Sequence, residues 1–310
     1  MLNDKKLHTS NDVLLTPEQI AQFDRDGVIG PFKLYEPDEA KAILHTIRTK
    51  NIDTSKSIHG NEVNYDRHFD IPELARHISH PGIVKRVRAL LGHDLLCWRT
   101  EFFPKFPGDK ATEWHQVANY RYATGVPMLE SALPELDMPL DITVWTAFTD
   151  ATKENGCMRY IPGSHKKVYY DESKTVNVGR DKEFRSVTSD TQFYGYDFQE
   201  FKVDPRWDPE AERILDMEMK PGECVIFSAK CVHASYANST KRSTRFALTS
   251  RYTPAHVRVY PNMNEFIAHG GRFNLKASNY GPVLVSGQDH WSHNNVRTHD
   301  SHGQLFGLVD

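Results

Sequence analysis

The N-terminal part of the chain, residues 14–92, shows the periodicity of helices. Its apolar residues recur three and four positions apart, a spacing that places them on one face of a helix. Thr16 and Gln19 have the spacing of a capping box, in which both side chains accept backbone N–H groups at the start of a helix. Three segments begin with a proline, which suits the first position of a helix, and we expect them to be helical: residues 17–26, 37–50 and 81–91.

From Leu95 the period of the pattern changes to two. Short stretches rich in β-branched and aromatic residues alternate with turn residues such as Pro221-Gly222, which is typical of strands joined by tight turns. The expected strands are residues 95–105, 141–150, 158–161, 214–219, 224–228 and 245–252. Many short strands of this kind indicate a mainly β fold with helical additions, whose core is a double-stranded β-helix, the cupin-like jelly roll.

The pattern also suggests how the chain is organised. We expect residues 1–310 to form a single domain, with the jelly-roll core at residues 95–253 and a C-terminal extension at residues 254–310. Residues 168–209 are polar and weakly periodic. This segment is expected to be an insertion that covers one end of the barrel.

Composition and charge narrow the range of partners. The chain has 25% charged residues and a net charge of −3, so nucleic acid is not expected as a partner. No run of 18 apolar residues is present, and the first residues lack the apolar centre of a signal peptide. We therefore expect a cytoplasmic protein without a membrane segment.

Three residues recur in an order typical of an iron site. His115 lies in the segment Trp114-His115-Gln116, His233 follows after the Pro221-Gly222 turn and the next strand, and Arg245 lies on the last expected strand. Two imidazoles with open positions beside them suit ferrous iron. A buried arginine suits the far carboxylate of a dicarboxylate cosubstrate. Together these residues predict an Fe(II) and 2-oxoglutarate site that uses O2, although each of them alone is a weak signal.

Val117 departs from the usual ligand pattern of such a site. A His-x-Asp or His-x-Glu motif would supply a third ligand, but valine has no lone pair to give a metal. An anion such as chloride could fill the open position with the charge that the carboxylate would have carried. Other interpretations stay open: a ligand from Glu113, from Asn119 or from elsewhere in the chain, or a site without activity.

Several longer motifs carry a family resemblance. The chain resembles the phytanoyl-CoA dioxygenase-like superfamily, and within it the syringomycin-type non-haem iron halogenases, from about residue 14 to residue 305. The similarity is densest in four segments: NYDRH at 64–68, CWRTEFFPK at 97–105, TVWTAFTD at 143–150 and HASY at 233–236.

The resemblance implies a reaction and a set of residue roles. Enzymes of this type chlorinate an unactivated carbon of an aminoacyl group held on a carrier protein, in nonribosomal peptide biosynthesis. His115 and His233 would be the iron ligands, and Arg245 would bind the distal carboxylate of 2-oxoglutarate. Thr112 and Trp145 would line the cosubstrate pocket. Thr143 and Arg251 would belong to the polar network behind the open iron position.

Three features of this sequence differ from the halogenase pattern. The halogenases carry Ala or Gly at the position of Val117, and a small polar residue at that of Tyr122. Residues 161–165 look more like the hydroxylase version of that segment. These departures keep two alternatives open: an Fe(II)- and 2-oxoglutarate-dependent hydroxylase with a non-standard ligand set, and a catalytically inactive binding homologue.

Overall fold

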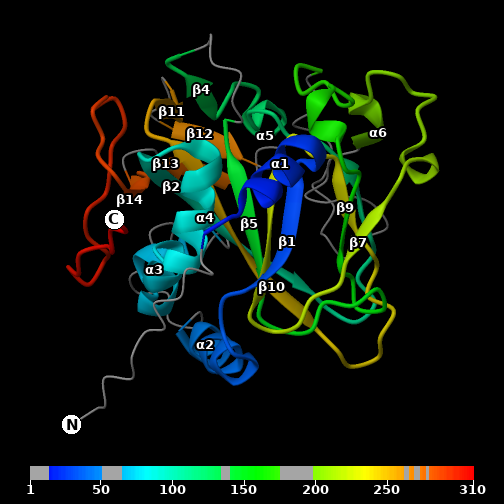
Figure 1. Ribbon diagram of the computed structural model, residues 1–310, viewed down its shortest axis with the longest axis horizontal. Helices are drawn as coiled ribbons and strands as arrows, with labels where there is room; N and C mark the ends of the chain where they lie inside the picture. The colour runs from blue at the N-terminus through cyan, green and yellow to red at the C-terminus, as the bar shows by residue number, and fades with distance from the viewer. Residues whose placement is uncertain are drawn as a thin grey trace.

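Two antiparallel sheets form the core of the protein (Figure 1). In this computed structural model the described residues are 14–50, 65–133, 140–174, 198–261, 265–268, 273–276 and 279–310. The larger sheet has six strands in the order β1 (Val28–Lys33), β8 (Glu223–Ser228), β5 (Ile142–Ala147), β10 (Arg245–Pro254), β2 (Leu95–Lys105) and β14 (Val283–Ser286). The smaller sheet has four, in the order β3 (Thr112–His115), β9 (His233–Ser235), β6 (Met158–Tyr160) and β7 (Leu215–Met217).

Helices cover the outer face of the six-stranded sheet. They are α1 (Pro17–Asp26), α2 (Pro37–Lys50), α3 (Pro72–Ile78) and α4 (Pro81–Leu91), and Figure 1 shows α1 and α4 in front of the strands. The expected capping box at Thr16 and Gln19 is present. Apolar residues of α1 and α4 share a buried cluster with Ile142 and Val144 of β5. Because side chains alternate along a strand, Thr143 and Trp145 point to the opposite face, where the pocket lies.

Shorter elements complete the described chain. Strand β4 (Leu129–Ser131) pairs with β11 (Val257–Val259), and β12 (Glu265–Ala268) pairs with β13 (Phe273–Lys276). The short helices are α5 (Arg121–Thr124), α6 (Phe198–Phe201) and the 3₁₀ turns Arg67–Phe69, Ser164–Lys166 and Pro209–Ala211. None of the helices in the described ranges is long and apolar enough to cross a membrane.

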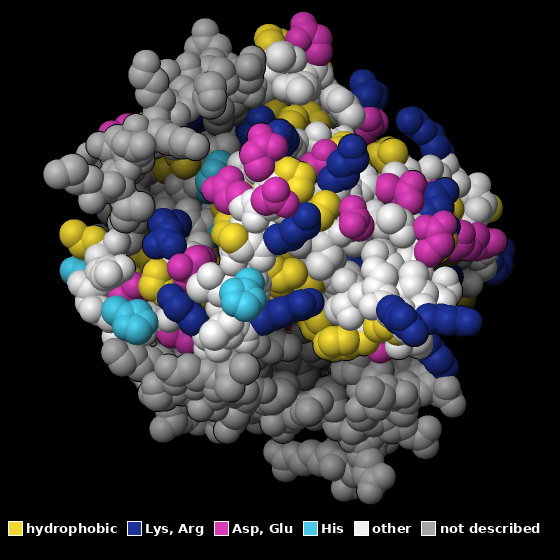
Figure 2. Space-filling model, turned by 90° about the horizontal axis from the view of Figure 1, so that it is seen from below, with side chains coloured by type: hydrophobic (Ala, Val, Ile, Leu, Met, Phe, Trp, Pro, Cys, Tyr) yellow, Lys and Arg dark blue, Asp and Glu magenta, His cyan; other side chains and the backbone are white. Residues whose placement is uncertain are grey.

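The predicted fold class is confirmed. Each expected helix has its expected bounds, and each expected strand is present with ends shifted by a few residues. The sequence did not anticipate helices α3, α5 and α6 or the strands β1, β3, β4, β9, β11, β12, β13 and β14. Asn64 and residues 175–197 of the expected insertion lie outside the described residues. Among the described residues on the face drawn in Figure 2, Lys and Arg side chains are interspersed with Asp and Glu.

Candidate active site

A pocket of about 600 Å³, including its open mouth, lies between the two sheets. The residues around it come from both sheets: β5, β8 and β10 of the larger sheet, and β3, β6 and β9 of the smaller one. All the residues that the sequence singled out for metal or cosubstrate lie in its wall, although they are far apart in the chain: Thr112, His115, Val117, Thr143, Trp145, His233, Arg245 and Arg251.

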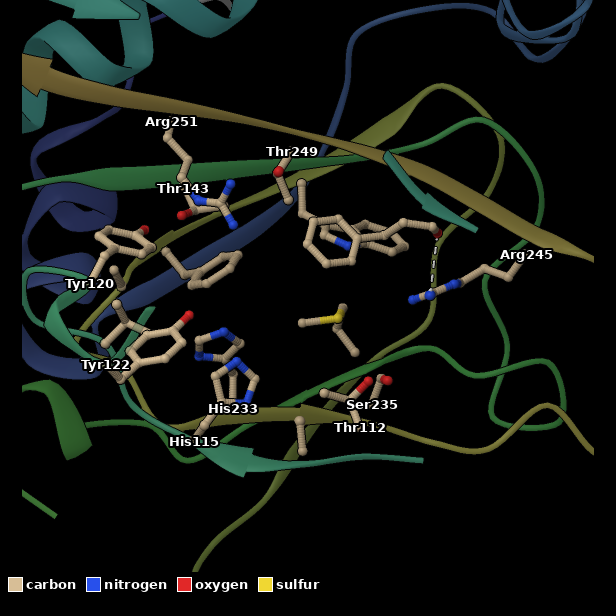
Figure 3. Close-up of a pocket in the computed structure, with 17 residues that line it drawn as sticks. Thr112, His115, Tyr120, Tyr122, Thr143, His233, Ser235, Arg245, Thr249 and Arg251 are labelled. Carbon is tan, nitrogen blue, oxygen red and sulfur yellow. Dashed lines mark hydrogen bonds between the residues drawn. The ribbon is translucent and has the colours of Figure 1, made fainter. Parts of the chain in front are cut away.

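The two histidines lie side by side in this wall (Figure 3). His115 ends β3 and His233 begins β9, and the pairing of these strands sets the two residues opposite each other. Their ring centroids are 4.1 Å apart. The Nδ1–H of His115 donates to the carbonyl of Glu113 at 2.8 Å, and that of His233 donates to the carbonyl of Cys231 at 2.7 Å. With the proton held on Nδ1, the lone pair of each ring is on Nε2.

Burial keeps both imidazoles neutral. It lowers the pKa of His115 to about 4, and it lowers the pKa of His233 well below the ordinary value, with the neighbouring His115 as a further cause. A neutral imidazole whose other nitrogen is fixed by a carbonyl is the form that binds a metal. The pair therefore suits a divalent ion such as ferrous iron.

Val117 lies next to this pair, where a third ligand would be expected. Its backbone N–H donates to the carbonyl of Ala229 at 3.0 Å, and its side chain is buried in an apolar cluster with Trp98 and Tyr120. Within the part of the chain that the structure describes, no group of three or more His, Cys, Asp or Glu side chains is placed to hold a metal. The described residues thus offer the two histidines and leave the third position without a protein ligand.

The alternative ligands considered from the sequence are not in the pocket wall. Glu113 gives its carbonyl to His115, and its side chain is not among those that line the pocket. The amide oxygen of Asn119 accepts the backbone N–H of Arg121 at 3.3 Å, so it is used in the turn before α5.

Arg245 is a buried cation at one end of the pocket. It is 3% exposed, its guanidinium lies 5.2 Å from the ring centroid of Trp145, and its Nη2 donates to the carbonyl of Phe103 at 3.4 Å. Its Nε has no hydrogen-bond partner, and burial lowers its pKa to about 10. A buried charge without a counter-ion is costly, so this end of the pocket suits an anionic group.

Arg251 lies at the other end of the pocket (Figure 3) and is already paired. Its Nη1 is 3.0 Å from a carboxylate oxygen of Glu101, and Thr143 is its partner across β5 and β10. Burial acts to lower the pKa of Arg251, but Tyr120, Glu101 and other anionic or phenolic neighbours outweigh it and raise that pKa. The pocket thus has a cation at each end, and Figure 3 shows the histidine pair on the side of Arg251.

Aromatic side chains close the pocket beside His115, and most of them were not anticipated. Phe198 of α6 stacks on the His115 ring with centroids 4.8 Å apart, and Tyr122 packs edge-on against Phe198 at 5.7 Å. Tyr122 also lines the pocket. Phe198 belongs to the weakly periodic segment 168–209, so no sequence pattern pointed to it.

A jelly roll with paired neutral histidines and a buried arginine between its sheets is typical of cupin-class oxygenases. The sequence profile "Phytanoyl-CoA dioxygenase (PhyH)" matches residues 23–247. The chain therefore belongs to the phytanoyl-CoA dioxygenase family, and its enzyme class is that of an iron- and 2-oxoglutarate-dependent oxidoreductase.

Similar proteins agree with this assignment. The solved structure "CytC3 with Fe(II) and alpha-ketoglutarate" is 36% identical, with a TM-score of 0.74, over 96% of this chain and 98% of that one. An ectoine dioxygenase of Sphingopyxis alaskensis is 25% identical over 245 residues, which are 74% of each chain. A probable phytanoyl-CoA dioxygenase of Caenorhabditis elegans is 27% identical over 201 residues, 63% of this chain and only 55% of that protein.

Proposed function

We propose that this enzyme is a non-haem Fe(II)- and 2-oxoglutarate-dependent halogenase that chlorinates an unactivated carbon of an aminoacyl group. The observation that carries the proposal is Val117, which is buried in the pocket wall beside His115 and His233 and cannot bind a metal. The halogenase-like motifs of the sequence and the 36% identity to CytC3, solved with Fe(II) and alpha-ketoglutarate, support it.

The residues of the pocket fit the two groups that this reaction needs. His115 and His233 would hold iron through Nε2, because their Nδ1 protons are committed to carbonyl groups. Arg245 receives the distal carboxylate of 2-oxoglutarate, which gives its Nε a partner. When bound, iron and 2-oxoglutarate would supply the O2-driven oxidation that replaces a C–H hydrogen of the substrate with chloride.

The residues around the third iron position have their own tasks in this proposal. Val117 leaves the position open to chloride and keeps water away from it with its apolar side chain. Thr143 and Arg251 form the polar wall on that side of the pocket, and Thr112 and Trp145 line the cosubstrate end. A buried anion is favoured near the Arg251 guanidinium, although Glu101 already offsets part of that charge.

Hydroxylation with the same cofactors is the second candidate function, and specific residues favour it. Val117 has two methyl groups more than alanine, which narrows the space for a halide. The Tyr122 hydroxyl points toward the imidazoles in Figure 3, where the halogenase pattern has a small polar residue. In this case the open position takes water, and the product gains oxygen.

The substrate is proposed from the resemblance alone. An aminoacyl thioester on a peptidyl carrier protein would reach the iron site through the open mouth of the pocket. The aromatic side chains of Tyr122 and Phe198 beside His115 would then bound the space for the aminoacyl group.

Product analysis distinguishes the candidates. Fe(II)-loaded enzyme is incubated with 2-oxoglutarate, chloride, labelled O2 and a panel of free and carrier-bound amino acids, and products are measured by mass spectrometry. The proposal predicts succinate together with a product that shows the chlorine isotope pattern. A product that contains labelled oxygen and no chlorine would show that the enzyme hydroxylates its substrate instead. An enzyme that binds neither iron nor 2-oxoglutarate contradicts both.

A further inference from the structure

Two buried cations face each other at the cosubstrate end of the pocket. Lys105 ends β2, and Arg245 begins β10 directly opposite it in the pairing of these strands. The two residues are 5% and 3% exposed. Residues directly opposite in an antiparallel pair share a face of the sheet, and like charges in that arrangement destabilise it. A pair of this kind is most stable when an anion lies beside it.

The described surroundings of Lys105 supply hydrogen bonds but no carboxylate in direct contact, and Asp109 acts on it only from a distance. Its Nζ donates to the carbonyl of Lys110 at 2.7 Å, to Oγ of Ser235 at 2.9 Å and to the carbonyl of Tyr236 at 3.0 Å. Among the described residues, no carboxylate lies within ion-pair distance of either Lys105 or Arg245. The ammonium of Lys105 therefore has its hydrogen bonds, while no described carboxylate forms a direct ion pair with it.

Burial is the main reason that the ammonium of Lys105 is easily lost. It lowers the pKa of Lys105 to about 7, and the charge of Arg245 lowers it further, whereas Asp109 acts in the opposite direction. Cys157 and Tyr160 interact electrostatically with Arg245, but burial raises the pKa of both, so they stay neutral near pH 7. Among the described groups that act on Arg245, Lys105 is thus the one whose pKa lies near neutral pH.

Ser235 connects Lys105 to the pocket. Its hydroxyl oxygen accepts from Lys105, so its own O–H must donate in another direction. The residue lines the pocket, and Figure 3 shows it beside Thr112 on the side of Arg245. The O–H of Ser235 and the unpartnered Nε of Arg245 are therefore two donors for one incoming carboxylate.

We propose that Lys105 is a positioning residue for the cosubstrate, which takes up a proton when the distal carboxylate of 2-oxoglutarate binds Arg245 and which orients the Ser235 hydroxyl toward that carboxylate. The inference rests on the proposed role of Arg245. Because the carboxylate favours the ammonium form, binding raises the pKa of Lys105 from its value in the empty pocket. Affinity for 2-oxoglutarate is then highest below about pH 7 and falls by up to about tenfold per pH unit above it.

Calorimetry of 2-oxoglutarate binding tests this directly. The Fe(II)-loaded protein is titrated without oxygen at about pH 8, in two buffers with different ionisation enthalpies, which gives the number of protons exchanged. We expect the wild type to take up nearly one proton per 2-oxoglutarate. 2-Oxopentanoate has the same length but a methyl group in place of the distal carboxylate, so its binding should take up almost none.

Two substitutions of Lys105 test separately the effect of its positive charge and the effect of its change in protonation. Lys105→Arg keeps a permanent charge, so it should bind 2-oxoglutarate without proton uptake and with an affinity that is flat from about pH 7 to 9. Lys105→Met should bind at least about tenfold more weakly at about pH 6.5, again without uptake. Lys110→Arg, which changes an exposed side chain beside the contacting carbonyl, should behave like the wild type.

The outcomes of this experiment are distinct. Equal proton uptake with 2-oxoglutarate and 2-oxopentanoate overturns the inference, and this comparison needs only the wild-type protein. Uptake that persists in Lys105→Arg or Lys105→Met overturns it as well. A wild type that does not bind 2-oxoglutarate contradicts the proposed function instead.

Discussion

At the scale of single residues, the proposed function depends on Val117, which decides which ligands the proposed iron site has. Its N–H is held by the carbonyl of Ala229, so a substitution changes the side chain while the backbone stays anchored. Its side chain shares the pocket wall with His115 and His233. In the proposed site, the chemistry of this one side chain therefore determines whether the third iron ligand comes from the protein or from an exogenous anion.

Replacing Val117 with aspartate should close that position. Val117→Asp supplies the carboxylate of a complete iron triad, so we expect Fe(II) to bind about tenfold more tightly or better and chloride to lose its effect on the site. Val117→Ala is the matched control, because it has no ligand atom either and should keep the response to chloride. Fe(II) affinity is measured by competition with a chelator. An aspartate variant with unchanged iron affinity would show that position 117 does not face the metal.

Arg245 is the second residue whose substitution should change ligand binding measurably. Arg245→Met removes the charge that we assign to the distal carboxylate, and it should weaken 2-oxoglutarate binding by about 100-fold or more, with Fe(II) affinity unchanged. The 2-oxoglutarate affinity of Arg245→Lys should lie between those of Arg245→Met and the wild type, because an ammonium cannot make the bidentate contact. Arg206→Met, at an exposed position, is the control. Equal 2-oxoglutarate affinity in Arg245→Met and wild type would assign the carboxylate to another residue.

At the scale of elements, hydrogen bonds connect residues 164–172 to the turn that follows β3. Gln116 donates to the carbonyls of Ser164, Lys167 and Lys230, and its amide oxygen accepts the N–H groups of residues 169 and 170. Glu172 accepts the N–H of Asn119 at 2.9 Å. These contacts tie residues 164–172 to the turn that includes Val117.

The buried carboxyl of Glu172 should make the free energy of unfolding depend on pH. Burial raises the pKa of Glu172 to about 7, although the backbone N–H groups of residues 118–121 oppose this shift. The folded-state pKa is above the unfolded value, so the stabilisation is complete below the unfolded pKa and is lost as pH rises through about 7. Glu172→Gln keeps an acceptor without a charge. At about pH 8 it should be more stable than wild type by about 1 kcal/mol, roughly 2–4 °C in Tm, and the gap should nearly vanish only below about pH 4, under the unfolded pKa.

Thermal unfolding at several pH values checks this expectation. Glu200→Gln, at an exposed position in α6, is the control and should follow the wild type at every pH. A gap between Glu172→Gln and wild type that is the same at low and high pH would mean that ionisation of Glu172 has no part in it.

The same elements show how far the sequence alone could lead. Strands β5 and β10 were predictable because alternation of apolar residues and nearby turns mark them, and their alternation also exposes Thr143 and Arg245 to the pocket. Helix α3 and strand β14 are too short to show a period, so they were missed. Phe198 was missed because its segment has no pattern. The proximity of Lys105 to Arg245 depends on strand register, which the hydrophobic pattern does not give between distant segments.

At the scale of the whole molecule, the pocket is a gap between two sheets that only the folded chain creates. Helices cover the far side of the larger sheet, and the histidines and the arginine come from different strands. The unfolded chain lacks this arrangement. Ligands of the pocket therefore bind the native state alone and stabilise it by mass action.

Because these ligands bind only the native state, we predict that Fe(II) and 2-oxoglutarate together increase the stability of the fold. Fe(II) and 2-oxoglutarate together, at about 100 times their Kd and without oxygen, should stabilise the fold by about 2.7 kcal/mol for each ligand that binds independently. 2-Oxoglutarate without metal should do much less, because chelation of the metal is absent. Differential scanning calorimetry provides the measurement, and Arg245→Met should lose the 2-oxoglutarate part while it keeps the metal part. Full stabilisation by 2-oxoglutarate without metal would contradict this account of the site.

The central claim, an iron site whose third position is open to chloride, is tested most directly by absorption spectroscopy. The purified protein is mixed with Fe(II) and 2-oxoglutarate in the absence of oxygen and titrated with chloride. We predict a visible charge-transfer band that shifts or strengthens with chloride until it saturates, with no such response in Val117→Asp. A band that is identical at every chloride concentration would contradict the claim, because it would mean that Val117 closes the position to the halide.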